Sequence, residues 1–183
     1  IRLAIAFVKK QAASLGFPPQ KLTICGITAG AYLALLSAVI QPNEYLGKSN
    51  ELLDEKTHPK AVIAFSPIVS LMKDYHSIKI NKLINELLSF DSSKEQAPFI
   101  KDCSPSERPE DFNCPLLMIH HENNKEIPIE SIRKFQQELI SCQVPVKLIT
   151  NIENINAIDE VQPIKANPEI MRNIENFLQE FLL

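Results

Sequence analysis

Five residues, Gly26-Ile27-Thr28-Ala29-Gly30, have the spacing of a nucleophile elbow, with threonine where serine is usual. Such an elbow is a sharp turn from a strand into a helix. It raises one hydroxyl above a sheet, and its neighbours must be small because strand and helix nearly touch. The chemistry served by this geometry is acyl transfer, in which the hydroxyl attacks a carbonyl carbon. It also needs a histidine base and a carboxylate that orients the histidine.

The segments on both sides of this pattern fit a strand–turn–helix unit. Apolar, β-branched residues over 22–25 predict a buried strand, and the Ala/Leu-rich segment 29–40 predicts a helix that ends near Pro42. The backbone N–H of Ala29 would then lie at a helix N-terminus, where it favours anions and forms half of an oxyanion hole. Cys25 is expected to be a buried, inert thiol of that strand.

Further strands are predicted at 61–65, 116–119 and 146–149. Helices are predicted over 1–15, over 129–140 with Ile132, Phe135, Leu139 and Ile140 inward, and from Pro168 with Ile170, Ile174, Phe177, Leu178 and Phe181 as the buried stripe. Strands that alternate with helices favour the α/β class. We therefore expect a parallel sheet of about four strands with helices on both faces, in three layers.

The order of several short segments carries a family resemblance. They are the elbow, Ala64-Phe-Ser-Pro67, Cys103-Ser-Pro105, Pro115-Leu-Leu-Met-Ile-His120 with Ile127-Pro128, and Val144-Pro-Val-Lys-Leu-Ile149. Together they resemble the C-terminal portion of α/β-hydrolases of the esterase/lipase group, which includes hormone-sensitive-lipase-like and BD-FAE-type carboxylesterases. The resemblance implies one partial α/β-hydrolase domain over 1–183 without the family's N-terminal strands, whose loop supplies the other oxyanion donor.

The resemblance also bears on an insertion at 68–113, which contains an amphipathic helix pattern over 78–90. In the family this region often forms part of a cap over the active site. A peripheral helix packed on the edge of the domain is the alternative.

The resemblance places three catalytic positions on this chain. Thr28 stands at the nucleophile position, where a β-branched side chain resists positive φ. Asn124 stands at the acid position, and an amide cannot carry the charge that stabilises imidazolium. Asn156 aligns with the base, in a loop that holds no histidine. With its proton-handling groups replaced, the predicted site, including the Ala29 N–H, is vestigial.

Other groups offer weak substitutes for the missing base and acid. His121 is a candidate for a displaced base, but a structural role at the strand end is favoured for the pair His120-His121. Glu122 or Glu126 could replace the acid, although solvated positions are expected for both. A metal site from His120, His121 and Glu122 is disfavoured because adjacent residues of an extended chain point to opposite faces. We expect no metal and no cofactor.

Asparagine replaces glycine in the loops that would hold the acid and the base. No glycine follows Gly47, and these loops carry Asn123, Asn124, Asn151, Asn154 and Asn156. Asparagine tolerates left-handed backbone better than most residues. We therefore expect the turn geometry to persist without the chemistry.

Two functional hypotheses follow. The first is a catalytically inactive hydrolase relative that acts as a pseudoenzyme, a binding module or a remnant. The alternative is a carboxylic-ester hydrolase that uses Thr28 with replacement partners, or that is completed by another chain and acts on a small acyl ester. The sequence alone leaves the question of enzymatic activity open.

Composition excludes some other classes. Net charge is −3 with acidic and basic residues interspersed, whereas a nucleic-acid surface would show clustered lysine and arginine. The apolar start, Ile1 to Val8, is too short to span a membrane, and its lysines follow it, so no leader is predicted. The four cysteines show no C-x-x-C pair and no zinc spacing, and a reducing compartment such as the cytoplasm is favoured.

A final expectation concerns assembly. In the family the elbow strand is interior to the sheet, and its outer neighbour belongs to the part that this sequence does not contain. An open strand edge presents unpaired backbone groups to other chains. We therefore predict a homodimer, or pairing with a separate front-half polypeptide, through the edge of the elbow strand.

Overall fold

The fold is that of a computed structural model, which describes residues 1–40, 57–72, 77–88, 93–150 and 167–182. Four strands form one parallel sheet in the order β1-β2-β3-β4. They are β1 (Thr23–Ile27), β2 (Ala61–Phe65), β3 (Leu116–Ile119) and β4 (Val146–Ile149). The predicted parallel sheet of about four strands is confirmed.

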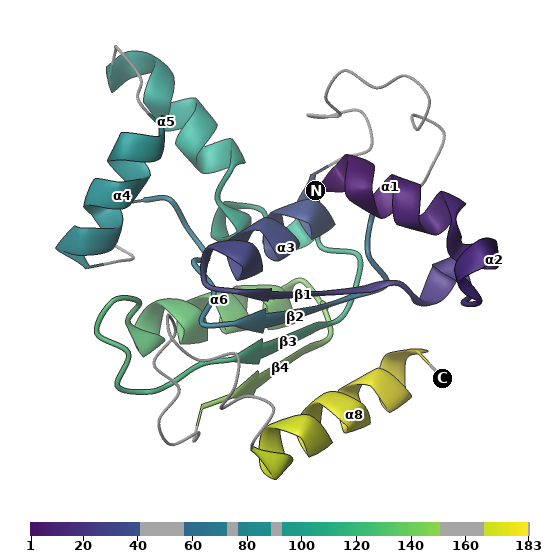
Figure 1. The fold of residues 1–183 in the computed structure, drawn as a ribbon. Helices are drawn as coiled ribbons and strands as arrows, with labels where there is room; N and C mark the ends of the chain where they lie inside the picture. The colour runs from purple at the N-terminus through teal and green to yellow at the C-terminus, as the bar shows by residue number, and fades with distance from the viewer. Residues whose placement is uncertain (41–56, 73–76, 89–92, 151–166, 183) are drawn as a thin grey trace.

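The helices lie between and around these strands (Figure 1). They are α1 (Arg2–Lys10), α2 (Ala12–Leu15), α3 (Ala29–Val39), α4 (Ile78–Leu88), α5 (Ser93–Asp102), α6 (Ile129–Ser141) and α8 (Pro168–Leu182), with 3-10 turns at η1 (Pro19–Lys21), η4 (Pro105–Glu107) and η5 (Pro109–Asp111). The single helix predicted over 1–15 is divided at Gln11. Its second part ends at Gly16, whose φ of 77° is the left-handed conformation of a C-terminal glycine.

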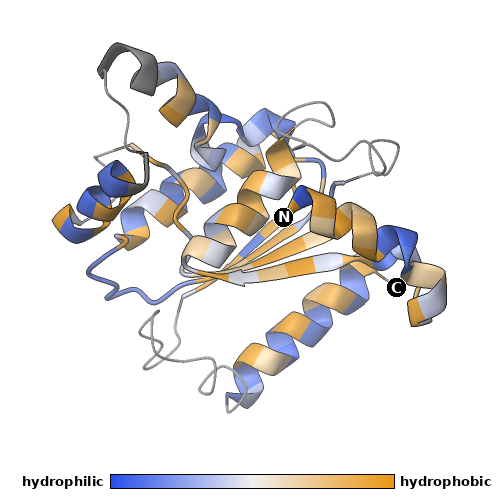
Figure 2. Ribbon diagram, turned by 45° about the horizontal axis from the view of Figure 1, so that its top comes forward, coloured by the Kyte–Doolittle hydropathy of each residue, from blue (hydrophilic) through white to orange (hydrophobic). Residues whose placement is uncertain are grey.

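Helices cover both faces of the sheet, as predicted. On one face, Leu35 of α3 and Phe135 of α6 join a core with Val62, Leu116 and other inward strand residues. On the other face, Ile170 and Phe177 of α8 pack on Ile63, Phe65 and Ile119. Figure 2 shows the apolar side of α8 turned toward the sheet and its polar side turned outward. The result is a three-layer α/β fold.

Three local predictions are wrong. Cys25 is exposed, because β1 is the edge strand and lacks a neighbour on its outer side among the described residues. Ile140 is 55% exposed, because it turns away from the face that buries Leu139 in the last turn of α6. Asn123 and Asn124 do not have positive φ; among the described residues only Thr28, Ser66, Gln143 and Gly16 do.

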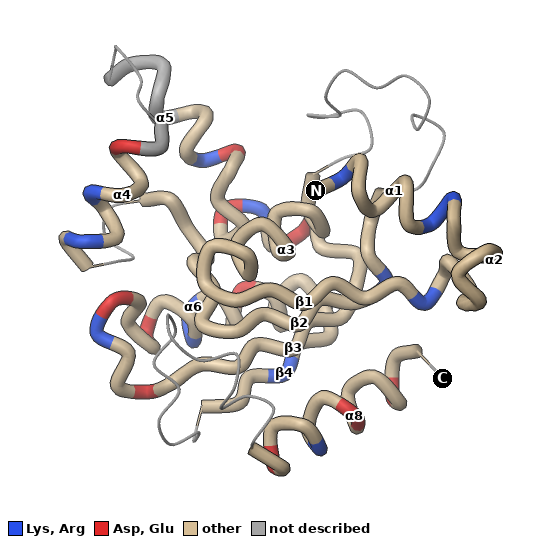
Figure 3. Tube along the Cα trace, in the orientation of Figure 1, with Lys and Arg blue, Asp and Glu red and all other residues tan. Residues whose placement is uncertain are grey.

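Residues 1–40 carry Arg2, Lys9, Lys10 and Lys21 and no acidic residue, whereas the other described parts of the chain together carry both signs of charge (Figure 3). No helix in the described part of the chain is long and apolar enough to cross a membrane. Asn151, Asn154 and Asn156 of the predicted loop after β4 lie outside the described residues.

Candidate functional site

The elbow has the strained backbone that its pattern predicts. Thr28 follows β1 directly, precedes α3, and has φ 50° and ψ −106°. A β-branched residue rarely adopts this region, and the strain costs on the order of 1–3 kcal/mol. The surrounding structure therefore holds Thr28 in the conformation of an elbow residue. Ala29, the first residue of α3, is exposed at the helix N-terminus.

Close contact between strand and helix explains the first glycine of the pattern. A Cβ built on Gly26 would lie 2.2 Å from the carbonyl oxygen of Gly30, far inside any tolerated contact. A Cβ on Gly30 would meet nothing within 4 Å. The expected need for small residues thus holds at Gly26. The space beside Gly30 is open among the described residues.

The residues that follow the first three strands form a row along the carboxyl edge of the sheet. The N–H of Thr28 donates to Phe65 O at 2.9 Å, and the N–H of Ser66 donates to Ile119 O at 2.8 Å. The next N–H along, that of His120, donates to Ile149 O at 2.9 Å. These bonds continue the ladder one residue past each strand, so Ser66 lies between Thr28 and His120.

Ser66 is the second strained hydroxyl residue in this row. Its φ is 43°, and it is 1% exposed. Its Oγ is one of the buried side-chain atoms without a hydrogen-bond partner among the described residues, and Nδ1 of His120 is another. Buried polar atoms without partners are rare and costly, so two of them on neighbouring strands beside the elbow call for an explanation.

His120 is a neutral imidazole in this environment. Its Nε2 lies 2.9 Å from Ile127 O, and because a carbonyl only accepts, Nε2 carries the hydrogen and Nδ1 is a bare acceptor. Burial lowers the pKa of His120. The bond to Ile127 opposes that effect, and the nearby His121 adds to it. The structural role expected for this histidine is consistent with its place between strand and loop.

The lowered pKa of His120 predicts a loss of stability in mild acid. At a pH below the ordinary histidine pKa of 6.5, His120 binds a proton in the unfolded chain but stays neutral in the folded chain. We expect the free energy of unfolding to fall by up to about 1.4 kcal/mol per pH unit below that value. Urea titrations between pH 7.5 and 5.5 measure it. His121→Gln should keep the slope and His120→Gln should lose it; equal slopes in both variants would contradict the assignment.

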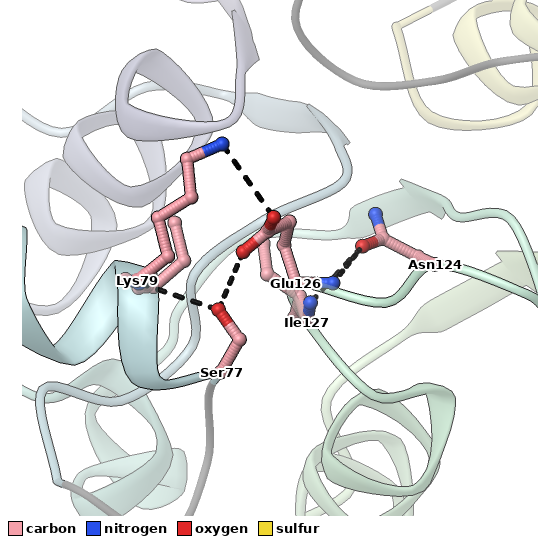
Figure 4. A network of polar contacts seen from close by, with 6 residues as sticks. Ser77, Lys79, Asn124, Glu126 and Ile127 are labelled. Carbon is pink, nitrogen blue, oxygen red and sulfur yellow. Dashed lines mark hydrogen bonds and ion pairs between the residues drawn. The ribbon is translucent and has the colours of Figure 1, made fainter.

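Asn124, the predicted acid position, organises its own loop. Its Oδ1 accepts hydrogen bonds from the backbone N–H of Glu126 at 2.9 Å and of Ile127 at 3.0 Å (Figure 4). This side-chain turn gives the loop its shape with ordinary φ, which is why left-handed backbone is not needed there. A carboxylate oxygen would accept the same two bonds.

The same loop is tied to the start of α4. Glu126 accepts from the hydroxyl of Ser77 and forms an ion pair with Lys79 at 3.5 Å (Figure 4). The backbone N–H of Ser77 also donates to Glu126 O at 2.9 Å. Glu122 pairs with Arg133 at 2.8 Å on the exposed surface. Both glutamates that were considered as replacement acids are therefore engaged in contacts with other side chains.

The insertion also contacts the elbow helix. The hydroxyl of Tyr32, in the first turn of α3, donates to Cys103 O at 2.9 Å, and Ile80 and Ile84 of α4 join the core on the α3 face. In Figure 1, α4 and α5 stand beyond the end of the sheet at which the strands terminate. The insertion is thus anchored to the elbow helix and to the Asn124 loop.

The structure brings together only part of the predicted site. Thr28 and Ala29 form the elbow, Asn124 lies in the loop after β3, and Asn156 lies outside the described residues. No group of three potential metal ligands occurs in the described ranges. Sequence reasoning missed Ser66 as a site residue. The signal was its place directly after a strand that pairs with the elbow strand.

Comparisons with known proteins agree with this geometry. The BD-FAE family model matches residues 1–139. An esterase of the planctomycete Thermogutta terrifontis with butyrate bound has a TM-score of 0.72 and 23% identity, over 98% of this chain and 63% of that chain. An acetyl ester-xyloside bifunctional hydrolase of Caldicellulosiruptor lactoaceticus has a TM-score of 0.75 and 16% identity, over the same shares. No curated protein matches the chain.

These solved structures show the fold, and this chain spans less than two thirds of their length. The family model covers well over half of the chain and includes the elbow, β2, β3 and most of α6. The chain therefore belongs to the BD-FAE family of esterase-like α/β-hydrolases.

Proposed function

We propose that this protein binds short acyl groups at the elbow and does not hydrolyse esters at a significant rate. The observation that carries the proposal is the intact elbow backbone at Thr28, with the N–H of Ala29 at the start of an eleven-residue helix. A helix N-terminus favours negative charge and serves developing oxyanions. The site thus keeps its means of holding a carbonyl or carboxylate oxygen.

The ligand class is supported by the relatives. The esterase of Thermogutta terrifontis is known with butyrate bound and with propionate bound. Both are short carboxylates, which carry the negative oxygen that an elbow N–H would stabilise. We propose the same class, a small acyl ester or its carboxylate, as the ligand here. In this proposal α4 serves as a cap beside the bound acyl group.

Loss of turnover follows from the proton-handling positions. Without a carboxylate at position 124 and a histidine in the loop after β4, the chain lacks the family's means of activating the Thr28 hydroxyl. Triad members act as a unit, so the loss of one already removes most of the rate. The alternative is ester hydrolysis by Thr28 with replacement partners or with a second chain.

An assay on p-nitrophenyl butyrate separates the two. We expect the wild-type protein and Thr28→Ala to give the same rate, at the level of the uncatalysed reaction. Butyrate binding, measured by calorimetry, should survive in Thr28→Ala within a few fold, because the Ala29 N–H remains. Turnover in the wild type that disappears in Thr28→Ala would establish the hydrolase.

A triple variant tests whether the missing groups explain the expected lack of turnover. Thr28→Ser, Asn124→Asp and Asn156→His together should raise the rate above wild type, since the loop already offers two N–H donors to residue 124. In a serine protease, replacing the triad aspartate by asparagine alone lowers turnover about 10⁴-fold, which indicates the scale of a full recovery.

We also propose that a strand from another polypeptide covers the outer edge of β1. Within the described residues β1 pairs only with β2, and Cys25 in its middle is exposed. The occupant is a second copy of the chain or a front-half polypeptide. Sedimentation should show a dimer, or a complex once the front half is added, and alkylation of Cys25 should slow on assembly while that of exposed Cys142 does not. A persistent monomer with equally reactive thiols would contradict the proposal.

A further inference from the structure

The carboxyl edge of the sheet contains two buried polar atoms that lack partners among the described residues. They are Oγ of Ser66 and Nδ1 of His120, in side chains that are each 1% exposed. The Ser66 hydroxyl can donate a hydrogen bond. Because Nε2–H of His120 donates to Ile127 O, Nδ1 of the neutral ring can only accept one. They are complementary, and they lie on neighbouring strands.

The register places this pair next to the elbow. The ladder bonds from the N–H groups of Thr28 and Ser66, at 2.9 and 2.8 Å, put the three residues side by side on adjacent strands. Neighbouring strands are about 4.8 Å apart, a spacing across which rotation of a short serine side chain can direct its hydroxyl toward one neighbour or the other. The φ of 43° at Ser66 marks it, with Thr28, as a strained residue of this edge.

We propose that Ser66 and His120 form a hydroxyl–imidazole pair through which carboxylate binding at the elbow takes up a proton. The inference rests on the proposed binding function and extends it. It makes His120 a positioning residue, because it acts on the ligand only through Ser66.

The direction of the Ser66 hydroxyl provides the coupling. In the proposed pair, the Ser66 side chain rotates so that its hydroxyl donates to Nδ1 while the ring is neutral, and its lone pairs then face the elbow, which disfavours an anion. When Nδ1 is protonated, Nδ1–H donates to Oγ of Ser66, and the hydroxyl hydrogen is released to donate to the carboxylate. One carboxylate and one proton therefore bind together, and no covalent bond changes apart from the N–H formed.

Among the residues that the structure describes, few other ionisable groups face this edge. β2 and the buried segment that follows it to Leu71 carry none, and α3 carries Tyr32, whose hydroxyl donates to Cys103 O. In the loop after β3, Glu126 is paired with Lys79 and Glu122 with Arg133, while Lys125 is exposed. Lys147 of β4 pairs with Glu180 of α8. His121 follows His120 in the chain, and its electrostatic effect lowers the pKa of His120 and so favours the neutral ring before ligand binds.

Calorimetric titration of the wild-type protein with butyrate between pH 8 and 6 tests the inference. We expect the affinity to rise as pH falls, by up to about tenfold per pH unit, which is the limit for one proton per ligand. Titrations in buffers of different ionisation enthalpy should show proton uptake. Nitrogen NMR of the wild type should show the pKa of His120 rising when butyrate is added.

A matched pair of variants isolates Ser66. Ser66→Ala should lose the pH dependence of butyrate binding, because no hydroxyl then links His120 to the ligand. Ser106→Ala removes another buried serine whose Oγ lacks a partner among the described residues, away from this row, and should keep the pH dependence. His120→Gln should behave like Ser66→Ala, while the NMR titration of the wild type does not depend on whether any variant folds.

The outcomes are distinct. Butyrate binding with equal affinity at pH 8 and 6, or an unchanged pKa of His120, would overturn this inference and leave the proposed function intact. Loss of the pH dependence in Ser106→Ala as well as in Ser66→Ala would also overturn it, because the effect would then be one of general packing. Absence of butyrate binding at every pH would overturn both proposals.

Discussion

Gly26→Ala is expected to destabilise the fold by about 3 kcal/mol or more, the upper end for a forced overlap in a packed interior. The added Cβ would lie 2.2 Å from Gly30 O and 2.4 Å from Gly30 C. Both are main-chain atoms of the first turn of α3, so no side-chain rotation relieves the contact. Relief requires the helix to move from the strand and to break the elbow. The free energy of unfolding in urea measures the loss.

Gly30→Ala is the matched control for this change. It adds the same methyl group four residues away, where nothing lies within 4 Å. Alanine also favours helix over glycine by about 1 kcal/mol in a helix interior, so this variant should be neutral or slightly more stable. Equal destabilisation by the two variants would show that close strand–helix contact is not what requires Gly26.

Phe177→Ala is expected to cost about 3–5 kcal/mol, the range for removal of a buried aromatic side chain. Phe177 is fully buried between α8 and the sheet, with the ring of Phe181 at 5.1 Å between centroids. Among the described helices, α8 alone contributes buried residues to the core on this face. Loss of the ring therefore weakens the contact that closes one side of the sheet.

Met171→Ala provides the comparison on the same helix. Met171 is 37% exposed, and its replacement should change the free energy of unfolding by no more than about 0.5 kcal/mol. Thermal unfolding followed by circular dichroism measures both variants. A loss below about 1 kcal/mol in Phe177→Ala would indicate that α8 is dispensable for the stability of the sheet.

The elements with the strongest pattern were predictable from the sequence. β2 and β3 are continuous apolar runs buried on both faces, and α8 has a regular apolar stripe, so their positions follow from residue spacing alone. The elbow was also predictable, because Gly26 and the small residue after Thr28 mark a strand–turn–helix contact. The structure adds the positive φ at Thr28 that the pattern implies.

Other features depend on tertiary contacts that cannot be predicted from a local sequence pattern. The apolar pattern of its strand predicts that Cys25 is buried. Only the order of the strands in the sheet shows that this strand lies at an edge. Asn124 reads as a left-handed turn residue, yet its side chain meets two backbone N–H groups and makes that conformation unnecessary. Ser66 and His120 are 54 positions apart in the chain, so their adjacency emerges only from the register of β2 and β3.

The contact at Gly26 has a consequence for how such proteins are found. The first glycine of the five-residue pattern is required because main-chain atoms of the helix lie so close to it. This requirement does not depend on which side chain occupies the nucleophile position, Thr28 in this chain. A genome search that relies on this glycine therefore detects the close contact between strand and helix and gives no information on catalytic activity. Counts made in this way are counts of the strand–helix contact, and turnover has to be measured separately.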